Sequence, residues 1–124
     1  MAREPVRRVL LVEDDEDNRE LMSEVLEAAG YEVEAASTGA EGLRKLSLGT
    51  FDVVVTDMAM PGMGGLEMAR AVKELAPSLP VLAVTGYAEG EEMVRARSEV
   101  DAVLVKPIYP DSLISALDQI LSGS

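Results

Sequence analysis

Short apolar runs rich in valine and leucine alternate along this chain with amphipathic stretches, and the alternation occurs five times. The runs predict strands at residues 6–12, 31–36, 51–56, 81–84 and 102–105. The stretches between and after them carry apolar side chains at helical spacing, except that the mostly polar stretch 89–97 predicts its helix least clearly. Strands that alternate with helices of this length form right-handed βαβ units, so the pattern predicts an α/β fold with a parallel sheet covered on both faces.

Capping and breaking residues indicate where the helices begin and end. Asp14 or Asp15 is expected to cap the first helix, and Gly30 to end it. A third helix is expected from about residue 66 to residue 75, before two prolines. The last helix is expected to stop before residues 122–124, which we expect to fray.

Length and charge restrict the classes of function that remain. The chain has 124 residues with 48% hydrophobic side chains, which predicts one globular domain over residues 1–124. The formal net charge of −12 argues against nucleic acid or an anionic membrane as a direct partner, because both would be repelled. Cysteine is absent, and no run approaches the roughly 20 apolar residues that span a bilayer. We therefore expect a cytoplasmic protein that acts through protein contacts.

Charged residues follow three of the predicted strands. Glu13 and Asp14 come after the first strand, Asp57 after the third and Lys106 after the fifth. In an open parallel sheet these carboxyl ends border one crevice, which is where ligands bind. Crowded carboxylates repel one another unless a divalent cation neutralises them, and a lysine beside them calls for an anion. The pair implied is Mg²⁺ and a phosphoryl group.

Each of these residues also has an ordinary structural interpretation. The acids at 13–15 suit a helix N-terminus, and Asp57 before a Pro/Gly segment suits a turn. Thr85 at the end of the fourth strand would usually be hydrogen-bonded locally, and Lys106 would usually be solvated. All of these interpretations together would require four independent coincidences at the same edge of the sheet, which favours one shared site.

Four segments in a fixed order resemble the receiver domains of two-component response regulators. They are LVEDD at 11–15, DMAMPGMGG at 57–65, VTG at 84–86 and KP at 106–107. The resemblance extends from about residue 6 to residue 121. It implies a flavodoxin-like (βα)5 fold with strand order 2-1-3-4-5, and phosphorylation of an aspartate by a histidine kinase or a phosphotransfer protein.

The same resemblance implies the roles of individual residues. Asp57 would be the phosphoacceptor, attacking phosphorus to form an acyl phosphate, while Lys106 and the Thr85 hydroxyl would balance charge on the phosphoryl oxygens. The implied Mg²⁺ ligands are Asp14 directly, Glu13 through water, Asp57 and the backbone carbonyl of Ala59. Such a domain is not a turnover enzyme, since phosphorylation switches its contacts with a downstream protein target.

Two departures from the family pattern affect the switch and the lifetime of the phosphoryl group. Val103 stands where many receivers have an aromatic switch residue, so coupling through rotation of a ring is not available. Ala59 and Tyr87 occupy positions that modulate hydrolysis in the family, and we expect a slowly decaying aspartyl phosphate because Ala59 cannot orient water and Tyr87 could cover the group. Gly86 is expected to leave the approach to the phosphorus open, and Pro107 to fix the chain after Lys106.

Other functions fit the sequence less well than this one. A haloacid-dehalogenase-type phosphatase would need a second acid where Ala59 stands, and a flavodoxin would need aromatic residues and a Ser/Thr-rich phosphate loop. The main alternative is a protein-interaction module that keeps the receiver scaffold without phosphorylation. Methionines at 58, 60 and 63 could form a partner surface, although packing of the loop is the stronger interpretation. A homodimer through the last helices, and origin in a larger regulator or hybrid kinase, both stay open.

Overall fold

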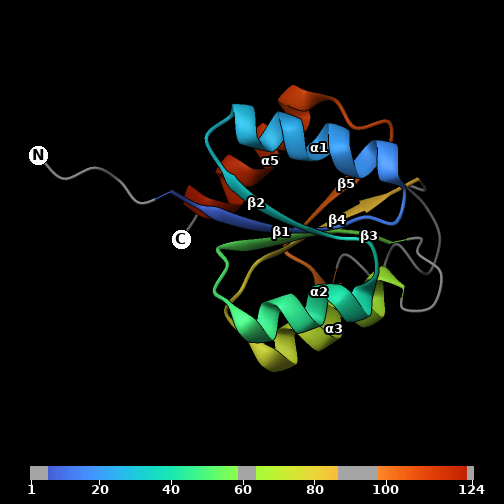
Figure 1. Ribbon diagram of the computed structural model, residues 1–124, viewed down its shortest axis with the longest axis vertical. Coiled ribbons are helices and arrows are strands. Elements are labelled where there is room, and N and C mark those ends of the chain that lie inside the picture. The colour runs from blue at the N-terminus through green and yellow to red at the C-terminus, as the bar shows by residue number, and fades with distance from the viewer. Residues whose placement is uncertain (1–5, 59–63, 87–97, 123–124) are drawn as a thin grey trace, which may run out of the picture.

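The computed structural model describes residues 6–58, 64–86 and 98–122, and within these ranges it contains five strands and four helices (Figure 1). In chain order the elements are β1 (Arg8–Val12), α1 (Glu16–Ala28), β2 (Glu32–Ala36), α2 (Gly39–Leu48), β3 (Val53–Asp57), α3 (Gly65–Leu75), β4 (Val81–Thr85), β5 (Ala102–Val105) and α5 (Pro110–Ser122). None of the helices in these ranges is both long enough and apolar enough to cross a membrane. The helix predicted over 89–97 lies outside the described residues.

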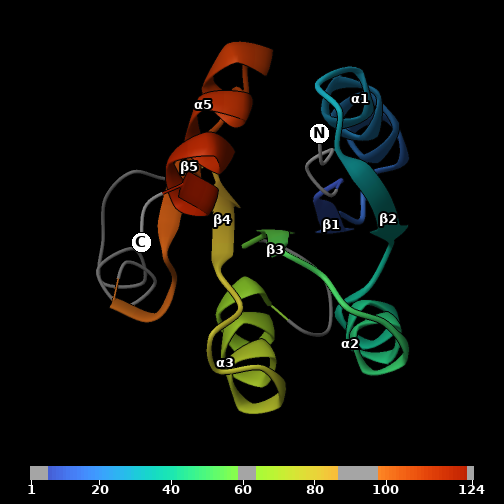
Figure 2. The same cartoon turned by 90° about the vertical axis from the view of Figure 1, so that its left-hand side faces the viewer.

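The five strands form one parallel sheet in the order β2-β1-β3-β4-β5 (Figure 2). The predicted flavodoxin-like order is therefore confirmed. β1 pairs with β2 on one side and with β3 on the other, so the chain reverses its direction of winding between β1 and β3. That reversal is the topological switch point, beside which ligands bind in open parallel sheets.

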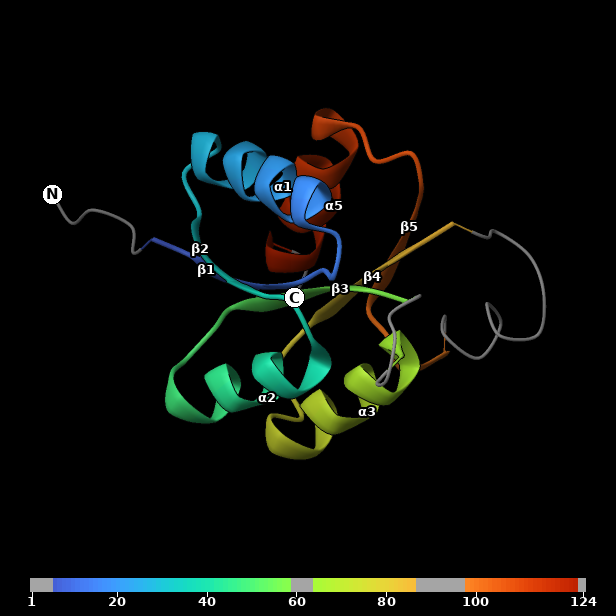
Figure 3. The same cartoon turned by 45° about the vertical axis from the view of Figure 1, so that its right-hand side comes forward.

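Helices cover both faces of the sheet, with α1 and α5 on one side and α2 and α3 on the other (Figures 1 and 3). Successive side chains of a strand point to opposite faces, and β1 shows the consequence. Leu10 and Val12 belong to the apolar cluster that contains residues of α2 and α3, whereas Val9 and Leu11 belong to the cluster that contains residues of α1 and α5. The continuous apolar runs of the sequence thus supply two cores.

Burial follows the position of each strand in the sheet. Every residue of β3 and β4 is buried, as expected for central strands of a doubly covered parallel sheet. β2 forms one edge and is mostly half-buried, which agrees with the prediction of an edge-like second strand.

Side-chain caps fix the starts of two helices. Asp15 accepts a hydrogen bond from the Asn18 N–H and caps α1, and Thr38 caps α2 by accepting from the Glu41 N–H. Gly30 follows α1 with a φ of 99°, a left-handed conformation that favours glycine.

Several predicted boundaries shift by one or two residues. β1 begins at Arg8 rather than residue 6, because its pairing with β2 begins there. β3 begins later than predicted and extends to Asp57, and β4 extends to Thr85, because Asp57 and Thr85 still take part in ladder pairing. Ser122, which was predicted to fray, is the last residue of α5, and its hydroxyl donates to the Asp118 carbonyl one turn earlier.

Candidate functional site

Three acids predicted from the sequence come together at the carboxyl edge of the sheet. Glu13 follows β1 and Asp57 ends the adjacent β3, so strand pairing alone makes them neighbours. Carboxylate oxygens of Glu13, Asp14 and Asp57 all lie within 4.8 Å of one another. Glu13 and Asp57 are buried, with exposures of 2% and 4%, whereas Asp14 is exposed. The cluster therefore has a buried base and one side open to solvent.

A lysine from the far side of the sheet completes the cluster. Lys106 follows β5, and its Nζ lies 3.0 Å from Asp57 Oδ2. The Lys106 N–H also donates to the Thr85 carbonyl at 2.7 Å, which ties the residue to the end of β4. Thr85 is buried at the end of β4, next to Val84, the pairing partner of Asp57. The structure thus brings the predicted acids and lysine into contact, with Thr85 ending the strand between β3 and β5.

The environment of Glu13 changes its proton affinity. Burial is the main cause that raises the pKa of the Glu13 carboxyl to about 7, and the nearby charge of Asp57 adds to the rise. The Asp15 N–H, which donates to Glu13 Oε2 at 3.2 Å, acts in the opposite direction. Repulsion among the acids was expected from the sequence, but for Glu13 desolvation by burial raises the pKa more than the charge of Asp57 does.

Lys106 is influenced by the same cluster. Burial alone would lower the pKa of its ammonium, but the hydrogen bond and charge of Asp57, together with the charges of Glu13 and Asp14, outweigh burial and raise it. Lys106 is therefore a fixed positive charge beside the Asp57 carboxylate across the physiological pH range.

The structure describes some of the other predicted positions but not all of them. Val103 is half-buried in β5 opposite Ala83, and Pro107 is exposed after a cis peptide bond. A Cβ built on Gly86 would meet no described atom within 4 Å, so packing against the described residues does not require glycine there. Met58 is half-buried. Ala59, Tyr87 and the methionines at 60 and 63 lie outside the described residues, so their predicted roles stay predictions.

The donor set fits a hard divalent cation. Glu13, Asp14 and Asp57 offer only carboxylate oxygens, the ligand type that Mg²⁺ prefers, and the exposed side of the cluster leaves room for the water ligands that Mg²⁺ retains. Within the described ranges the cluster contains no cysteine or histidine donor, and the chain has neither residue. These residues could hold Mg²⁺, as the sequence predicted.

One residue beside the site, Arg19, was not predicted from the sequence. Arg19 of α1 donates from Nη1 to the Glu13 carbonyl at 3.0 Å and, at 3.5 Å, to the Asp14 carbonyl. The available signal was a single cation in an otherwise acidic helix start, EDDEDNRE at 13–20. Spacing along a helix could not show that the guanidinium turns back toward the preceding loop.

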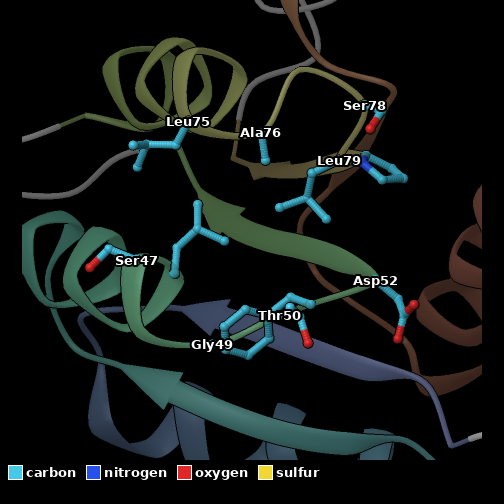
Figure 4. A pocket seen from close by; sticks show the side chains of 11 residues that line it. Ser47, Gly49, Thr50, Asp52, Leu75, Ala76, Ser78 and Leu79 are labelled. Carbon is cyan, nitrogen blue, oxygen red and sulfur yellow. The ribbon is translucent and has the colours of Figure 1, made fainter.

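A separate groove lies at the opposite, amino edge of the sheet (Figure 4). Its volume is about 640 Å³, and it lies between the end of α2, the end of α3 and the segments that lead into β3 and β4. Phe51, Leu75 and Leu79 contribute apolar surface to it. The groove contains none of the residues of the acidic cluster.

A doubly wound parallel sheet with an acidic, lysine-paired cluster at its switch point defines a class of α/β domains suited to magnesium-dependent phosphoryl chemistry. Residues 9–118 match the family described as the response regulator receiver domain, and the chain belongs to that family. The resemblance inferred from four sequence segments is thereby confirmed.

Known relatives differ greatly in length. The chain is 35% identical over 117 residues to the response regulator receiver protein CpdR of Brucella abortus, covering 94% of this chain and 98% of that protein. It is 36% identical to the sensor histidine kinase RcsC of Salmonella typhi, covering 88% of this chain but only 12% of the kinase. Among solved structures, the response regulator TrrA of Thermotoga maritima, in complex with Mg²⁺-BeF, is 31% identical with a TM-score of 0.86, covering 94% of this chain and all of that one.

Proposed function

We propose that this receiver domain takes a phosphoryl group onto Asp57, from a phosphohistidine of a histidine kinase or phosphotransfer protein, and transmits its state through protein contacts. One observation carries the proposal: the buried Asp57 carboxylate lies 3.0 Å from Lys106 Nζ and within 4.8 Å of two further carboxylates, at the switch point of the sheet. A buried acid in this setting is oriented by Lys106 and lies beside the exposed Asp14.

The proposed reaction forms one bond and breaks one. An Asp57 carboxylate oxygen attacks phosphorus in line, and the bond from phosphorus to the donor nitrogen breaks with its electron pair remaining on the imidazole. Lys106, which binds Asp57 Oδ2 in the described state, would then meet charge on the phosphoryl oxygens. The Thr85 hydroxyl is the proposed second partner of those oxygens, since Thr85 ends the neighbouring strand.

The proposed Mg²⁺ ligands are Asp14 directly, Glu13 through water, Asp57, and the backbone carbonyl of Ala59, which lies outside the described residues. When bound, Mg²⁺ would neutralise the carboxylates and part of the charge on the phosphoryl oxygens. Support comes from the grouping of the three carboxylates and from a 31% identical relative whose structure holds Mg²⁺-BeF.

Phosphorylation by acetyl phosphate tests the proposal directly. Wild-type protein treated with acetyl phosphate and Mg²⁺ should show a phosphate-dependent electrophoretic shift, and Asp57→Asn should show none. Asp111→Asn, which changes an exposed acid in the first turn of α5, is the matched control and should behave as wild type. A shift of undiminished size in Asp57→Asn would refute the assignment of Asp57.

Magnesium should also stabilise the fold. Binding to the native state alone raises stability by mass action, so the thermal midpoint should rise with Mg²⁺ concentration. Identical midpoints in Mg²⁺ and in chelator would contradict the proposed metal site, whatever the outcome of the acetyl phosphate experiment.

We further propose a slowly decaying aspartyl phosphate, because Ala59 cannot orient a water and the Tyr87 ring could shield the group. Equal rates of phosphate loss in wild type and Tyr87→Ala would exclude the shielding idea. With Val103 in place of an aromatic residue, coupling to the output surface cannot use rotation of a ring and must use other parts of the structure.

The remaining proposals concern context. We propose that the chain forms one receiver domain, acts on a downstream protein without turnover chemistry, and works in a reducing compartment such as the cytoplasm, as its lack of cysteine suggests. Its net charge of −12 argues against direct contact with nucleic acid or an anionic membrane surface. Dimerisation through the last helices stays a prediction. The alternative function, an interaction module independent of phosphorylation, predicts that target binding is the same for wild type and Asp57→Asn.

A further inference from the structure

We propose that Arg19 is a positioning residue that sets the magnesium affinity of the acid loop, defined as Glu13, Asp14 and Asp15, by holding its main chain. The inference rests on the proposed function, since it concerns the same metal site. Arg19 lies in α1, and its own N–H donates to the Asp15 carbonyl at 2.9 Å. Its guanidinium reaches back over the loop to the carbonyls of Glu13 and Asp14, at 3.0 Å and 3.5 Å.

The acid loop is held by a chain of hydrogen bonds. The Glu13 N–H donates to the Ala36 carbonyl of β2 at 3.0 Å, which anchors the start of the loop to the sheet. Glu13 Oε2 accepts from the Asp15 N–H at 3.2 Å, and Asp15 Oδ2 accepts from the Asn18 N–H at 2.9 Å. Arg19 adds the contact to the carbonyls in the middle of the loop.

Main-chain and side-chain atoms of the loop serve different partners. The carboxylates of Glu13 and Asp14 lie with Asp57 in the acidic cluster, while their carbonyls accept from Arg19. The two hydrogen bonds from Arg19 therefore end on main-chain oxygens and use none of the carboxylate oxygens of these two residues. Arg19 is half-buried and always charged, so its restraint persists at every physiological pH.

Loss of this restraint would reduce preorganisation. Without Arg19 the carbonyl of the buried Glu13 loses a charged donor, and the loop must be ordered when the metal binds. Residues that hydrogen-bond to metal ligands and orient them commonly contribute 10- to 100-fold to metal affinity, and we expect about 10-fold here.

Electrostatics alone predicts the opposite sign. Removing a positive charge close to a cation site should strengthen binding of Mg²⁺, because repulsion between two cations is relieved. Weaker binding in a variant without Arg19 would therefore indicate positioning of the loop, not a change of charge.

The experiment compares three variants of the full chain with wild type. Arg19→Met keeps the apolar stem and removes all donors, and Arg19→Lys keeps the charge but loses the planar fork. Arg44→Met removes the same charge from an exposed position on α2 and is the matched control. The Mg²⁺ dissociation constant is measured by calorimetry without any phosphoryl donor, and the acetyl phosphate reaction is then followed against Mg²⁺ concentration.

We expect Arg19→Met to raise the Mg²⁺ dissociation constant about 10-fold and to raise the half-saturating Mg²⁺ concentration equally. The rate at saturating Mg²⁺ should stay near that of wild type, because Asp57 and Lys106 are intact. Arg19→Lys should give an intermediate constant, and Arg44→Met should bind Mg²⁺ as wild type does or slightly more tightly. A purely structural role would lower the saturated rate together with the affinity and would not be rescued by lysine.

Unchanged or tighter Mg²⁺ binding in Arg19→Met would overturn the inference. If Arg19→Met does not fold in chelator, Arg19→Lys decides, because a wild-type constant in that variant would show that the fork has no positioning role. The outcome is separable from that of the proposed function. A protein that binds Mg²⁺ through this loop yet never accepts phosphate would refute the function and leave the role of Arg19 intact.

Discussion

Glu13 should make the stability of the metal-free protein depend on pH in an unusual direction. Its pKa rises from 4.5 to about 7 in the folded state, chiefly because the side chain is only 2% exposed. The folded state therefore keeps a proton that the unfolded state releases between these values. Since the unfolded state binds fewer protons in that range, the free energy of unfolding falls as pH rises from about 4.5 to about 7.

The size of this effect follows from the pKa change. At about 1.4 kcal/mol for each pKa unit, the rise at Glu13 corresponds to a loss of about 3 kcal/mol across the window. That is a large share of the roughly 5–15 kcal/mol by which small domains are stable. Mg²⁺ should reverse the dependence, because it binds the deprotonated carboxylate and so favours the high-pH form.

Urea unfolding in chelator, at pH values from 4.5 to 8, measures the effect. Other carboxylates contribute their own pH dependence, so the informative quantity is the difference between wild type and Glu13→Gln, which carries a neutral amide at every pH. This difference should shift by about 3 kcal/mol in favour of Glu13→Gln between the two ends of the range. Glu24→Gln, at an exposed position on α1, is the matched control. Parallel profiles for wild type and Glu13→Gln would refute the reasoning.

Two further predictions concern the scaffold. A Cβ on Gly42 of α2 would lie 2.8 Å from Val12 Cγ2 and 3.0 Å from Met68 Cε. Gly42→Ala should therefore destabilise the domain by about 1 kcal/mol in urea unfolding, despite the better helix propensity of alanine. A net gain in stability would show that the β-branched Val12 side chain moves aside easily. The Tyr31 hydroxyl donates to Asp118 Oδ1 at 2.9 Å, and Tyr31→Phe should cost about 1 kcal/mol. Burial and this hydrogen bond raise the Tyr31 pKa from 10 to about 12, so wild type, unlike Tyr31→Phe, should lose stability as pH rises through that interval; equal alkaline profiles would contradict the prediction.

Much of the fold could be predicted because its signals are local. Strand runs, helix spacing and breaking residues identified every described element, since each depends on neighbours a few residues away. Boundaries were less certain. Asp57 and Thr85 were expected after their strands but end them, because ladder pairing with a distant strand extends the regular structure.

The candidate site, like the fold, could be predicted from local signals only in part. Its members were predictable because the carboxyl ends of parallel strands share one edge, so residue types at strand ends indicate a shared crevice. The cap of α1 was left open between Asp14 and Asp15, and the structure assigns it to Asp15. With Asp15 used as the cap, Asp14 is available to the metal cluster.

Sequence alone was enough to predict the order of the elements, the members of the acidic cluster and the family of the chain, because these depend on periodicity and on segments of a few residues. Tertiary packing was needed to show that Glu13 is buried while Asp14 is exposed, that Lys106 binds Asp57 directly, and that Arg19 donates to the carbonyls of the acid loop. Burial and long-range contact depend on which distant strands and helices surround a side chain. Residues 13 and 14 have the same chemistry, and only packing makes them differ.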